Sequence, residues 1–366
     1  MSAHPPIVHV VGARPNFMKA APVIAALRSR GVEQRLVHTG QHYDDALSAV
    51  FFRDLDLPRP DLDLGVGSGT QAGQTAALMV ALERAIGELR PSVVVVYGDI
   101  NSTLAAALVT AKLGIPLAHV EAGLRSFDRS MPEEVNRVVT DQLSSLLFVT
   151  SPEGLDNLAR EGVPGEPVFV GNPMIDTLLA NLERFDPDAG RAQFGLTGDY
   201  GVATIHRPAN VDDPAAAARI VAALRAVGEL LPVVLPLHPR GGATLAAAGL
   251  GGVDRVIVVE PLGYVEFLGL VRGARVAITD SGGIQEETTI LGIPCLTIRP
   301  NTERPITISQ GTNRLVEPEE VAECVREILD GGVNLPAGQP PLWDGHAGER
   351  IGAILADRYG PPASPG

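Results

Sequence analysis

Three acidic residues in the first half of the chain, Asp99, Glu121 and Glu133, are of the type that general acid–base chemistry uses. Asp99 and Glu121 each follow a short apolar run, and Glu133 opens a segment with helical apolar spacing. Helix capping explains Asp99 equally well, and the helix dipole favours an acid at Glu133. Glu121 differs, because a carboxylate at the end of a buried strand is costly without a partner or a function. Together the three predict acid–base catalysis at one sheet edge.

A glycine turn follows the first apolar run, and Arg14 and Lys19 lie in the stretch that follows Gly12. A turn that opens a helix presents free backbone N–H groups and the positive end of the helix dipole, which suits a phosphate. The stretch is not GxGxxG, so it carries no dinucleotide fingerprint. A plain strand-to-helix turn with a surface arginine and lysine explains it equally well.

The second half contains Ser281, Gly282 and Gly283 between an apolar run and an acidic helical segment. Glycines at this position let the backbone approach a diphosphate with its N–H groups. A carboxylate one turn into the helix is placed to accept hydrogen bonds from ribose hydroxyls. Arg304 supplies a further cation after the next run. We therefore predict a nucleotide diphosphate site, against the alternative of a glycine turn before an amphipathic helix.

His206 and Arg207 follow the first apolar run of the second half, and His238 and Arg240 follow the next one. These groups would lie at the same edge of a sheet as the Ser-Gly-Gly stretch. His206 is suited to stabilise or protonate a departing phosphate. A structural histidine with ordinary hydrogen bonds is the alternative.

The elements that must position these residues are short, β-branched runs alternating with helical segments. Six runs occur in each half: 7–11, 35–39, 93–98, 116–120, 146–150 and 168–171, then 200–206, 232–238, 256–260, 275–279, 294–298 and 313–317. Continuous apolar runs of this length predict parallel strands covered on both faces. The fold class is therefore α/β, with two Rossmann-like, doubly wound domains whose ligands lie at the carboxyl ends of the strands.

The boundary between the domains is expected after residue 171. Residues 1–171 would form the N-terminal domain, completed by a C-terminal helix at 346–359, and residues 172–345 the C-terminal domain with the predicted nucleotide diphosphate site. The stretch 331–345 is rich in Gly and Pro and predicts an irregular connection.

Composition excludes several classes of function. A net charge of −14 over 366 residues argues against nucleic acid or an anionic membrane as the main partner. Two cysteines provide no disulfide framework, and the histidines and cysteines show no metal-binding spacing, so no metal or other cofactor is expected. We expect a cytoplasmic protein, because the sequence shows neither a signal segment nor an apolar run of the ~18 residues that a membrane span needs.

Five stretches identify a resemblance: GARPNFMKAAP, YGDINSTLAAAL, HVEAGLRSFDRSMPEEVNR, IHRPANVD and DSGGIQEETTILGIPCLTIRPNTERP. In this order and spacing they resemble the non-hydrolysing UDP-N-acetylglucosamine 2-epimerases, over about residues 7–320. The resemblance implies the GT-B fold, in which two Rossmann-like domains face a central cleft, and a homodimer.

The resemblance also implies roles for individual residues. The family's catalytic carboxylates match Asp99, Glu121 and Glu133, and its second-domain histidine matches His206. Its substrate contacts match Arg14 and Lys19 in the first domain, with Phe267 by the uracil, Ser281, Gly282, Gly283 and Glu287 at the diphosphate and ribose, and Arg304.

The chemistry that the resemblance implies is elimination of UDP from C1 as a base removes the C2 proton. A 2-acetamidoglucal forms, and reprotonation at the opposite face with return of UDP gives UDP-N-acetylmannosamine, without NAD or metal. Asp99 is our first candidate for the C2 base, with Glu121 or Glu133 as the returning acid. Three alternatives remain: a hydrolysing epimerase that releases N-acetylmannosamine and UDP, a GT-B glycosyltransferase that uses a UDP-sugar, and a nucleotide-sugar binding protein.

One stretch departs from the family. Some members bind a second substrate molecule as an activator beside Gln-His-x-Gln/Glu, whereas this chain has Gln41, His42, Tyr43 and Asp44. The resemblance therefore does not imply activation by substrate.

Overall fold

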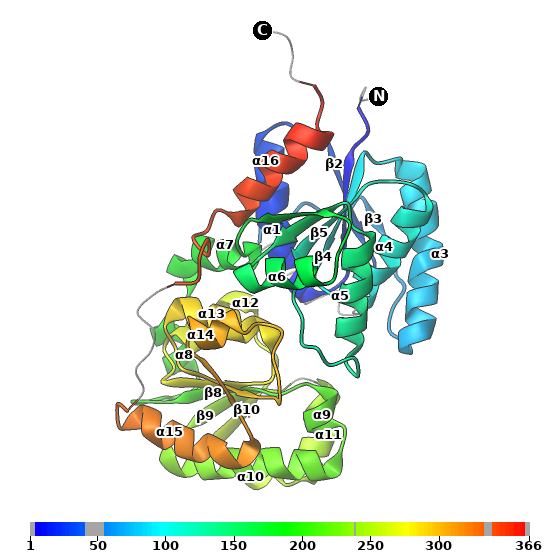
Figure 1. Ribbon diagram of the computed structural model, residues 1–366. Helices are drawn as coiled ribbons and strands as arrows, with labels where there is room; N and C mark the ends of the chain where they lie inside the picture. Colours follow the sequence, from blue (N-terminus) through cyan, green and yellow to red (C-terminus); the bar gives the residue numbers. More distant parts are fainter. Residues whose placement is uncertain (1–3, 41–54, 238, 333–338, 363–366) are drawn as a thin grey trace. The chain divides into compact units, whose positions relative to one another are not determined.

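The chain consists of two compact α/β units, each built on a parallel sheet (Figure 1). We describe them from a computed structural model that covers residues 4–40, 55–237, 239–332 and 339–362. The units are Met1–Ala180 with Pro341–Gly366, and Asn181–Pro340. Every strand pairing within them is parallel, which confirms the predicted fold class. No helix in the described ranges is long and apolar enough to cross a membrane.

The first unit has a seven-stranded sheet in the order β3-β2-β1-β4-β5-β6-β7. Its strands are β1 (Ile7–Val11), β2 (Gln34–His38), β3 (Leu62–Asp63), β4 (Val93–Tyr97), β5 (Leu117–Ala122), β6 (Leu146–Val149) and β7 (Glu166–Phe169). The strand order reverses between β1 and β4, and in open α/β sheets such a switch point is where ligands bind. The turns that carry Gly12 and Asp99 follow these two strands.

Helices cover the first sheet in two groups. One group is α1 (Arg14–Ser29), α7 (Pro173–Ala180) and α16 (Ala347–Tyr359), which pack on one another. The other contains α3 (Gln71–Leu89), α4 (Asn101–Lys112) and α5 (Pro132–Leu143), and α6 (Pro152–Arg160) packs on β6 and β7. Apolar side chains of β1 and β4 are fully buried against α3 and α4, as continuous apolar runs predict.

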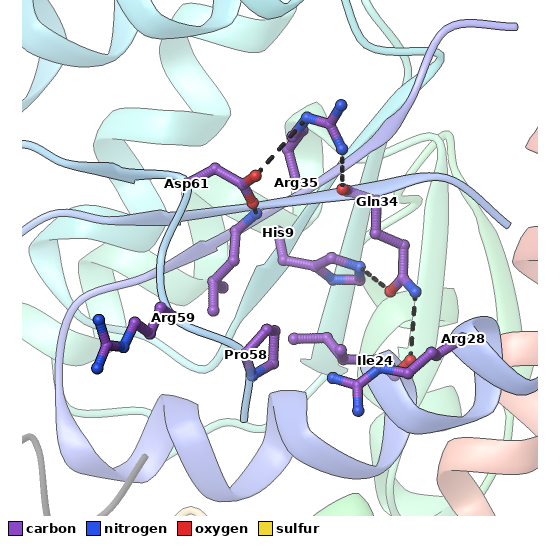
Figure 2. A pocket seen from close by; sticks show the side chains of 9 residues that line it. His9, Ile24, Arg28, Gln34, Arg35, Pro58, Arg59 and Asp61 are labelled. Carbon is purple, nitrogen blue, oxygen red and sulfur yellow. Dashed lines mark hydrogen bonds and ion pairs between the residues drawn. The ribbon is translucent and has the colours of Figure 1, made fainter. Parts of the chain in front are cut away.

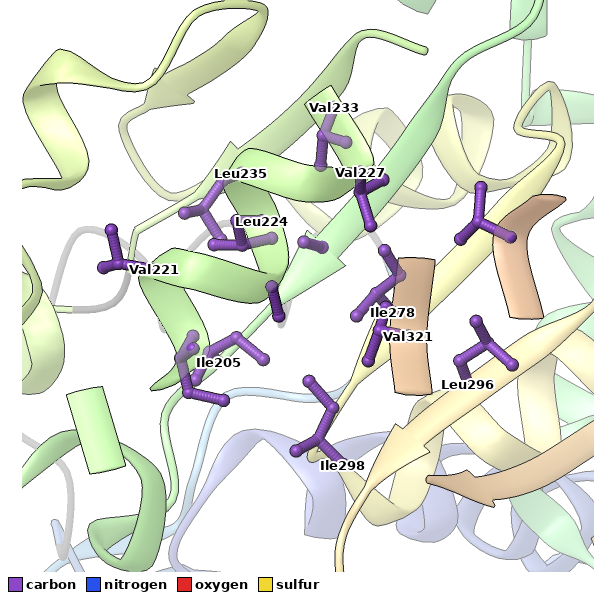
Figure 3. Packing of buried hydrophobic residues seen from close by; sticks show 14 of the residues in the cluster. Ile205, Val221, Leu224, Val227, Val233, Leu235, Ile278, Leu296, Ile298 and Val321 are labelled. Atoms are coloured by element: carbon purple, nitrogen blue, oxygen red, sulfur yellow. The ribbon is translucent and has the colours of Figure 1, made fainter. Parts of the chain in front are cut away.

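The second unit has a six-stranded sheet in the order β10-β9-β8-β11-β12-β13. The strands are β8 (Gly201–Thr204), β9 (Val233–Pro236), β10 (Val256–Val259), β11 (Val276–Thr279), β12 (Cys295–Ile298) and β13 (Asn313–Val316). The helices are α8 (Pro187–Gln193), α9 (Pro208–Val211), α10 (Pro214–Leu230), α11 (Pro239–Ala247), α12 (Tyr264–Arg272), α13 (Gly282–Leu291), α14 (Ile306–Ser309) and α15 (Val321–Leu329). Figure 3 shows its core, in which Leu224 and Val227 of α10 and Val321 of α15 pack on the sheet. Here the switch point lies between β8 and β11.

Each of the twelve predicted runs overlaps a strand, whereas β3 was not predicted. It is two residues long and lies at the sheet edge, paired only with Val37 and His38 of β2. Such a strand needs no long apolar run, because only one neighbour covers it.

The chain's last helix, α16, belongs to the first unit, as does α7. The carboxylate of Asp176 in α7 accepts hydrogen bonds from the backbone N–H groups of Ala347 (3.2 Å) and Gly348 (2.6 Å) at the start of α16. Just before α16, the indole N–H of buried Trp343 donates to the carbonyl of Thr150 (2.9 Å). The sequence places the change of domain after residue 171; these contacts are why α7, which follows that residue, packs with the first unit.

Gly348 allows α16 to approach α1 closely, which predicts an effect of its substitution. A Cβ atom at Gly348 would lie 2.6 Å from Cβ and 2.7 Å from the carbonyl carbon of Pro22. We expect Gly348→Val to lower the free energy of unfolding by about 2 kcal/mol, because overpacking forces the two helices apart. Chemical denaturation measures this change.

Gly87, in α3, provides the control, because apart from its chain neighbours and the backbone of its own helix no atom lies within 4 Å of the position of its Cβ. Gly87→Ala should stabilise the protein by about 0.5–1 kcal/mol. Equal stabilities of Gly348→Val and the unmodified protein would contradict the assigned packing of α16.

Candidate active site

Glu121 lies on a β-bulge at the end of β5. The register of β5 against β6 shifts between Val120 and Ala122, and Glu121 has a φ of +77°. This conformation is unfavourable for a residue with a Cβ and is found at functional sites where the surrounding structure enforces it. The bulge directs the carboxylate of Glu121 to the ammonium group of Lys19 in α1, with which it forms a buried ion pair.

Gly98 makes room for this ion pair. A Cβ at Gly98 would lie 3.1 Å from both the Glu121 Oε2 and the Lys19 Nζ atoms. Gly98 also has a φ of +62°, which a side chain would disfavour. The glycine therefore serves both the turn after β4 and the ion pair beside it.

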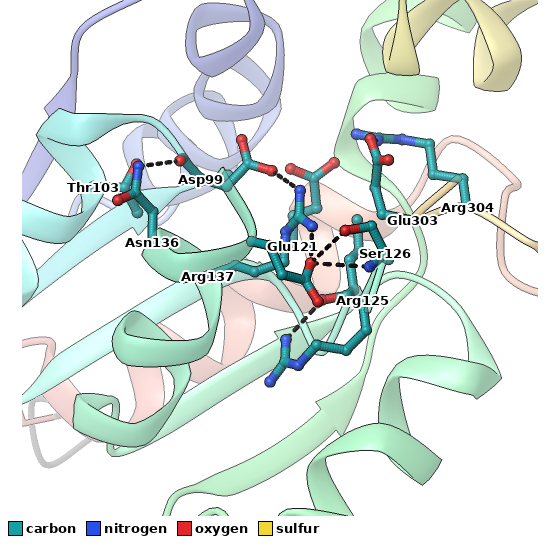
Figure 4. Close-up of polar contacts among 12 residues, drawn as sticks. Asp99, Thr103, Glu121, Arg125, Ser126, Asn136, Arg137, Glu303 and Arg304 are labelled. Atoms are coloured by element: carbon teal, nitrogen blue, oxygen red, sulfur yellow. Dashed lines mark hydrogen bonds and ion pairs between the residues drawn. The ribbon is translucent and has the colours of Figure 1, made fainter. Parts of the chain in front are cut away.

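Asp99 follows Gly98 at the adjacent strand end, and its side chain is 22% exposed. The Arg137 guanidinium, from α5, contacts the Asp99 carboxylate at 2.5 Å, and the Asn136 amide donates to the Asp99 carbonyl at 2.8 Å (Figure 4). The start of α5 is thereby fixed against the edge of β4. Since β4 and β5 are neighbours, Asp99 and Glu121 lie at the same edge of the sheet.

The two glutamates that open α5 have different environments. Glu134 is buried and accepts hydrogen bonds from the backbone N–H groups of Ser126 and Phe127 (2.9 Å each) and from Arg137. It therefore holds the segment between β5 and α5 in place. Glu133 is only partly buried, and its carboxylate makes no hydrogen bond or ion pair with another described residue. Its position on the first turn of α5 leaves it available to a ligand.

In the second unit, His206 and Asp280 form a dyad at the switch point. Asp280 directly follows β11 and is fully buried, and its Oδ1 atom lies 3.0 Å from the Nδ1 atom of His206. Burial raises the pKa of Asp280, but the hydrogen bond and charge of His206, with donation from Asn210 and the Arg207 backbone, lower it overall. Asp280 is thus a carboxylate that orients the imidazole through Nδ1, with Nε2 as the remaining ring nitrogen.

Ser281 precedes α13 at the N-cap position, and its hydroxyl makes no capping hydrogen bond. Arg304 lies across this helix terminus, since a Cβ at Gly282 would be only 2.5 Å from the Arg304 Nη1 atom. The Arg304 guanidinium contacts the carboxylates of Glu286 (2.9 Å) and Glu303. The predicted glycine turn and the predicted arginine are therefore neighbours.

Glu287 is buried within α13. Burial, together with the charge of Glu286, raises its pKa to about 8, although hydrogen bonding with Tyr264 acts in the opposite direction. Tyr264 opens α12, which also carries the half-buried Phe267 and packs on α13. The predicted ribose and uracil contacts thus lie on adjacent helices.

Several predicted residues have other surroundings or lie outside the described residues. Arg207 donates from Nε to the Asp280 carbonyl (2.8 Å) and lies 3.9 Å from Glu303. Arg14 begins α1, but its side chain, the side chain of Arg240, residue His238 and the stretch 41–44 are outside what the structure describes.

The sequence prediction missed Asn136, Arg137, Glu134 and Asp280 as parts of the site. The signal was available in part, since PEEVNR places Glu133, Asn136 and Arg137 at helical spacing of three and four residues, on one face of α5. The pairing of Arg137 with Asp99 required the fold.

A separate hollow of about 250 Å³ lies elsewhere on the first unit (Figure 2). It is lined by Gln34 and Arg35 at the start of β2, by Arg28 in the last turn of α1, and by Asp61, with which Arg35 pairs at 3.7 Å. It is therefore near the amino-terminal end of β2, away from the edge that carries Asp99 and Glu121.

Comparisons with known proteins give one consistent family. Residues 25–356 match the family model described as UDP-N-acetylglucosamine 2-epimerase. The UDP-N-acetylglucosamine 2-epimerase of Methanocaldococcus jannaschii is 40% identical over 94% of this chain and 97% of its own length. The UDP-2,3-diacetamido-2,3-dideoxy-D-glucuronate 2-epimerase of Pseudomonas aeruginosa is 39% identical over 96% and 99%.

Solved structures agree with this result. The M. jannaschii enzyme in complex with UDP-GlcNAc and UDP superposes with a TM-score of 0.89 at 40% identity, covering 96% of this chain and 99% of that one. The UDP-GlcNAc 2-epimerase of Neisseria meningitidis bound to UDP-GlcNAc has a TM-score of 0.86 at 27% identity, with coverage of 96% and 99%.

The raised pKa of Glu287 predicts a pH dependence of stability. Between its ordinary pKa of 4.5 and about 8, the folded protein keeps a proton that the unfolded chain releases. The stability that this proton contributes is fully present below pH 4.5 and is lost as the pH rises through the folded-state pKa of about 8. Its size is about 1.4 kcal/mol per unit of pKa shift. Glu287→Gln should therefore lose less stability than the unmodified protein between about pH 6 and about pH 9.

Denaturation at several pH values measures this difference, with Glu323→Gln on the exposed face of α15 as the control. Identical pH profiles for Glu287→Gln and the unmodified protein would show that Glu287 is ionised in the folded state at neutral pH.

Proposed function

Because this chain belongs to the UDP-N-acetylglucosamine 2-epimerase family, we propose that it interconverts UDP-N-acetylglucosamine and UDP-N-acetylmannosamine without net hydrolysis. The chain is an isomerase, as its relatives at 40% identity over nearly their whole length indicate. The observation in the structure that best supports this chemistry is the gathering of carboxylates at the switch-point edge of the first sheet, where Glu121 is enforced on a bulge beside Asp99.

We infer that the sugar is bound by the first unit. In the forward direction a base takes the proton from C2, the C1–O bond to UDP breaks, and a C1=C2 double bond forms. Asp99 is our candidate for this base, because its carboxylate is partly exposed while Arg137 fixes its position. Glu121 or Glu133 would deliver a proton to the opposite face of C2, and the UDP oxygen would return to C1. Lys19 and Arg14 would contact the substrate near these groups.

The departing UDP is the proposed ligand of the second unit. The N–H groups at the start of α13, from Ser281 to Gly283, and the Arg304 guanidinium would receive the diphosphate. Glu287 would meet the ribose and Phe267 the uracil. His206, oriented by Asp280, would stabilise or protonate the leaving oxygen, and the Arg207 guanidinium, which donates to the Asp280 carbonyl, would add positive charge beside it.

A second candidate substrate follows from the P. aeruginosa relative, whose name specifies UDP-2,3-diacetamido-2,3-dideoxy-D-glucuronate. Its identity to this chain is almost the same as that of the M. jannaschii enzyme. The reaction at C2 would be the same, so the two substrates must be compared directly.

Deuterium exchange tests the reaction. Incubation with UDP-N-acetylglucosamine in D₂O, followed by NMR, should give UDP-N-acetylmannosamine and deuterium at C2 of both sugars. Free N-acetylmannosamine would indicate the hydrolysing reaction instead. A folded protein that exchanges no C2 proton in this sugar or in the diacetamido glucuronate would refute the proposed function.

Asp99→Asn tests the assignment of the base. We expect C2 exchange to fall at least about 10³-fold, because an amide cannot accept the proton, while UDP binding changes little. The control is Asp156→Asn on the exposed face of α6, which should leave both properties unchanged. Exchange at the unmodified rate in Asp99→Asn would assign the base elsewhere.

The family resemblance also supports a homodimer acting in the cytoplasm. Light scattering at micromolar concentration should then give twice the mass of 38.3 kDa. A monomeric mass at the concentration used for assay would refute the dimer.

A further inference from the structure

A buried ion cluster lies next to the turns that carry Asp99 and Glu121, and its residues have been given no role in the proposed reaction. His119 of β5 and Asp141 of α5 are both fully buried, and the His119 Nδ1 atom lies 2.7 Å from the Asp141 Oδ1 atom. The other ring nitrogen, Nε2, lies 2.8 Å from the carbonyl oxygen of Gly98. One side chain thus links β5, α5 and the turn after β4.

These contacts reach the peptides on either side of the carboxylates. Gly98 directly precedes Asp99, so its carbonyl group belongs to the peptide that leads into Asp99. The second oxygen of Asp141 accepts a hydrogen bond from the backbone N–H of Gly123 (3.1 Å), two residues after Glu121. The His119–Asp141 pair therefore holds both turns that carry the two carboxylates.

Both turns need such a constraint. Gly98 and Gly123 have φ values of +62° and +82°, and Glu121 has +77°. Glycine visits many conformations, so external hydrogen bonds must select the observed orientation of these peptides. Displacing a reacting group by about 1 Å can reduce a rate by about 10²-fold.

The hydrogen-bond partners also define the state of the His119 ring. The carbonyl oxygen of Gly98 can only accept, and Asp141 is a carboxylate. Burial raises the pKa of Asp141, but the hydrogen bond and charge of His119, with those of Arg125, lower it overall. Both contacts are hydrogen bonds donated by the ring only if each ring nitrogen carries a hydrogen, which is the imidazolium form.

Arg125 and Glu161 complete the charge balance of the cluster. The Arg125 guanidinium lies 2.7 Å from Asp141 and makes two hydrogen bonds to Glu161, at 2.7 and 2.8 Å. Two carboxylates thus face one guanidinium and the His119 ring. A buried carboxylate paired in this way carries no uncompensated charge.

We propose that His119, as an imidazolium held by Asp141, is a positioning residue that fixes the Gly98 carbonyl and thereby sets Asp99 and Glu121 for the chemistry at C2. This inference rests on the proposed roles of Asp99 and Glu121. His119 itself touches no reacting atom; it acts through the two turns.

Two substitutions of His119 test its hydrogen bonds to Asp141 and to the Gly98 carbonyl one at a time. Glutamine places an amide N–H₂ group near the position of Nε2, so His119→Gln keeps a donor for the Gly98 carbonyl. Asparagine places its amide near Nδ1, so His119→Asn keeps a donor for Asp141 and loses the bond to Gly98. We expect kcat to fall about 10²-fold in His119→Asn and less than about tenfold in His119→Gln. KM and the Kd of UDP should stay within about threefold of the unmodified values, because the proposed nucleotide contacts lie in the second unit.

The kinetic comparison of the His119 variants needs a control substitution at a histidine outside the cluster. His346→Gln, at an exposed position before α16, should change none of these constants. An unchanged kcat in a folded His119→Asn, or equal losses in the two variants, would overturn the proposal. A folded but inactive unmodified protein would instead refute the proposed function and leave the geometry of the cluster untouched.

NMR of the unmodified protein with ¹⁵N-labelled histidine tests the inference independently of activity. The proposal requires a hydrogen on each ring nitrogen of His119 at neutral pH, with the signal assigned by its loss in His119→Gln. A His119 ring with one bare nitrogen would overturn the proposal.

Discussion

Charge burial is the constraint on which the first unit depends. Its sheet edge brings several carboxylates out of water, and an unpaired buried charge costs several kcal/mol. Cations meet these carboxylates: Lys19 of α1 pairs with Glu121, and Arg137 of α5 contacts both Asp99 and Glu134 of its own helix. These ion pairs do more than cancel charge, because they fasten the helices to the strand ends. Removing one partner would leave the other as a buried charge and would loosen the edge as a whole.

The second unit keeps its buried acids in a different way. Asp280 remains a carboxylate because hydrogen bonds from His206, Asn210 and backbone N–H groups surround it. Glu287 has Glu286 as its neighbour, and its pKa of about 8 keeps it protonated over much of the neutral range. A protonated carboxyl group can both donate and accept, which suits ribose hydroxyls, whereas charge is concentrated at Arg304 where a diphosphate would be received. The first unit thus keeps its buried acids charged by ion pairing, whereas the second relies on hydrogen bonds for Asp280 and on protonation for Glu287.

Features of the fold and the site that depend on local sequence could be predicted, whereas features that depend on contacts between residues far apart in the sequence could not. Strands buried on both faces appear as continuous apolar runs, so the sheets and the edge that carries Asp99 and Glu121 could be predicted. The left-handed conformation of Glu121 could not, because local preference opposes it and only the bulge against β6 enforces it. The pairs Arg137–Asp99 and His119–Asp141 join residues 38 and 22 positions apart. Their formation depends on the packing of α5, which no local pattern specifies.

The ion pairs of the first unit also matter for which of the two candidate sugars the protein would bind. The two relatives at 40% and 39% identity are both named as 2-epimerases, but their sugars differ at C3 and at C6, where the glucuronate carries a carboxylate. Among the described cations at the first unit's strand ends, Lys19, Arg125 and Arg137 are already bound to acids. Arg129, in the segment after β5, is exposed, and an ion pair in that setting contributes only about 0–1 kcal/mol. Overall identity does not distinguish the two sugars, so the choice between them depends on the groups that surround C3 and C6 of the bound sugar.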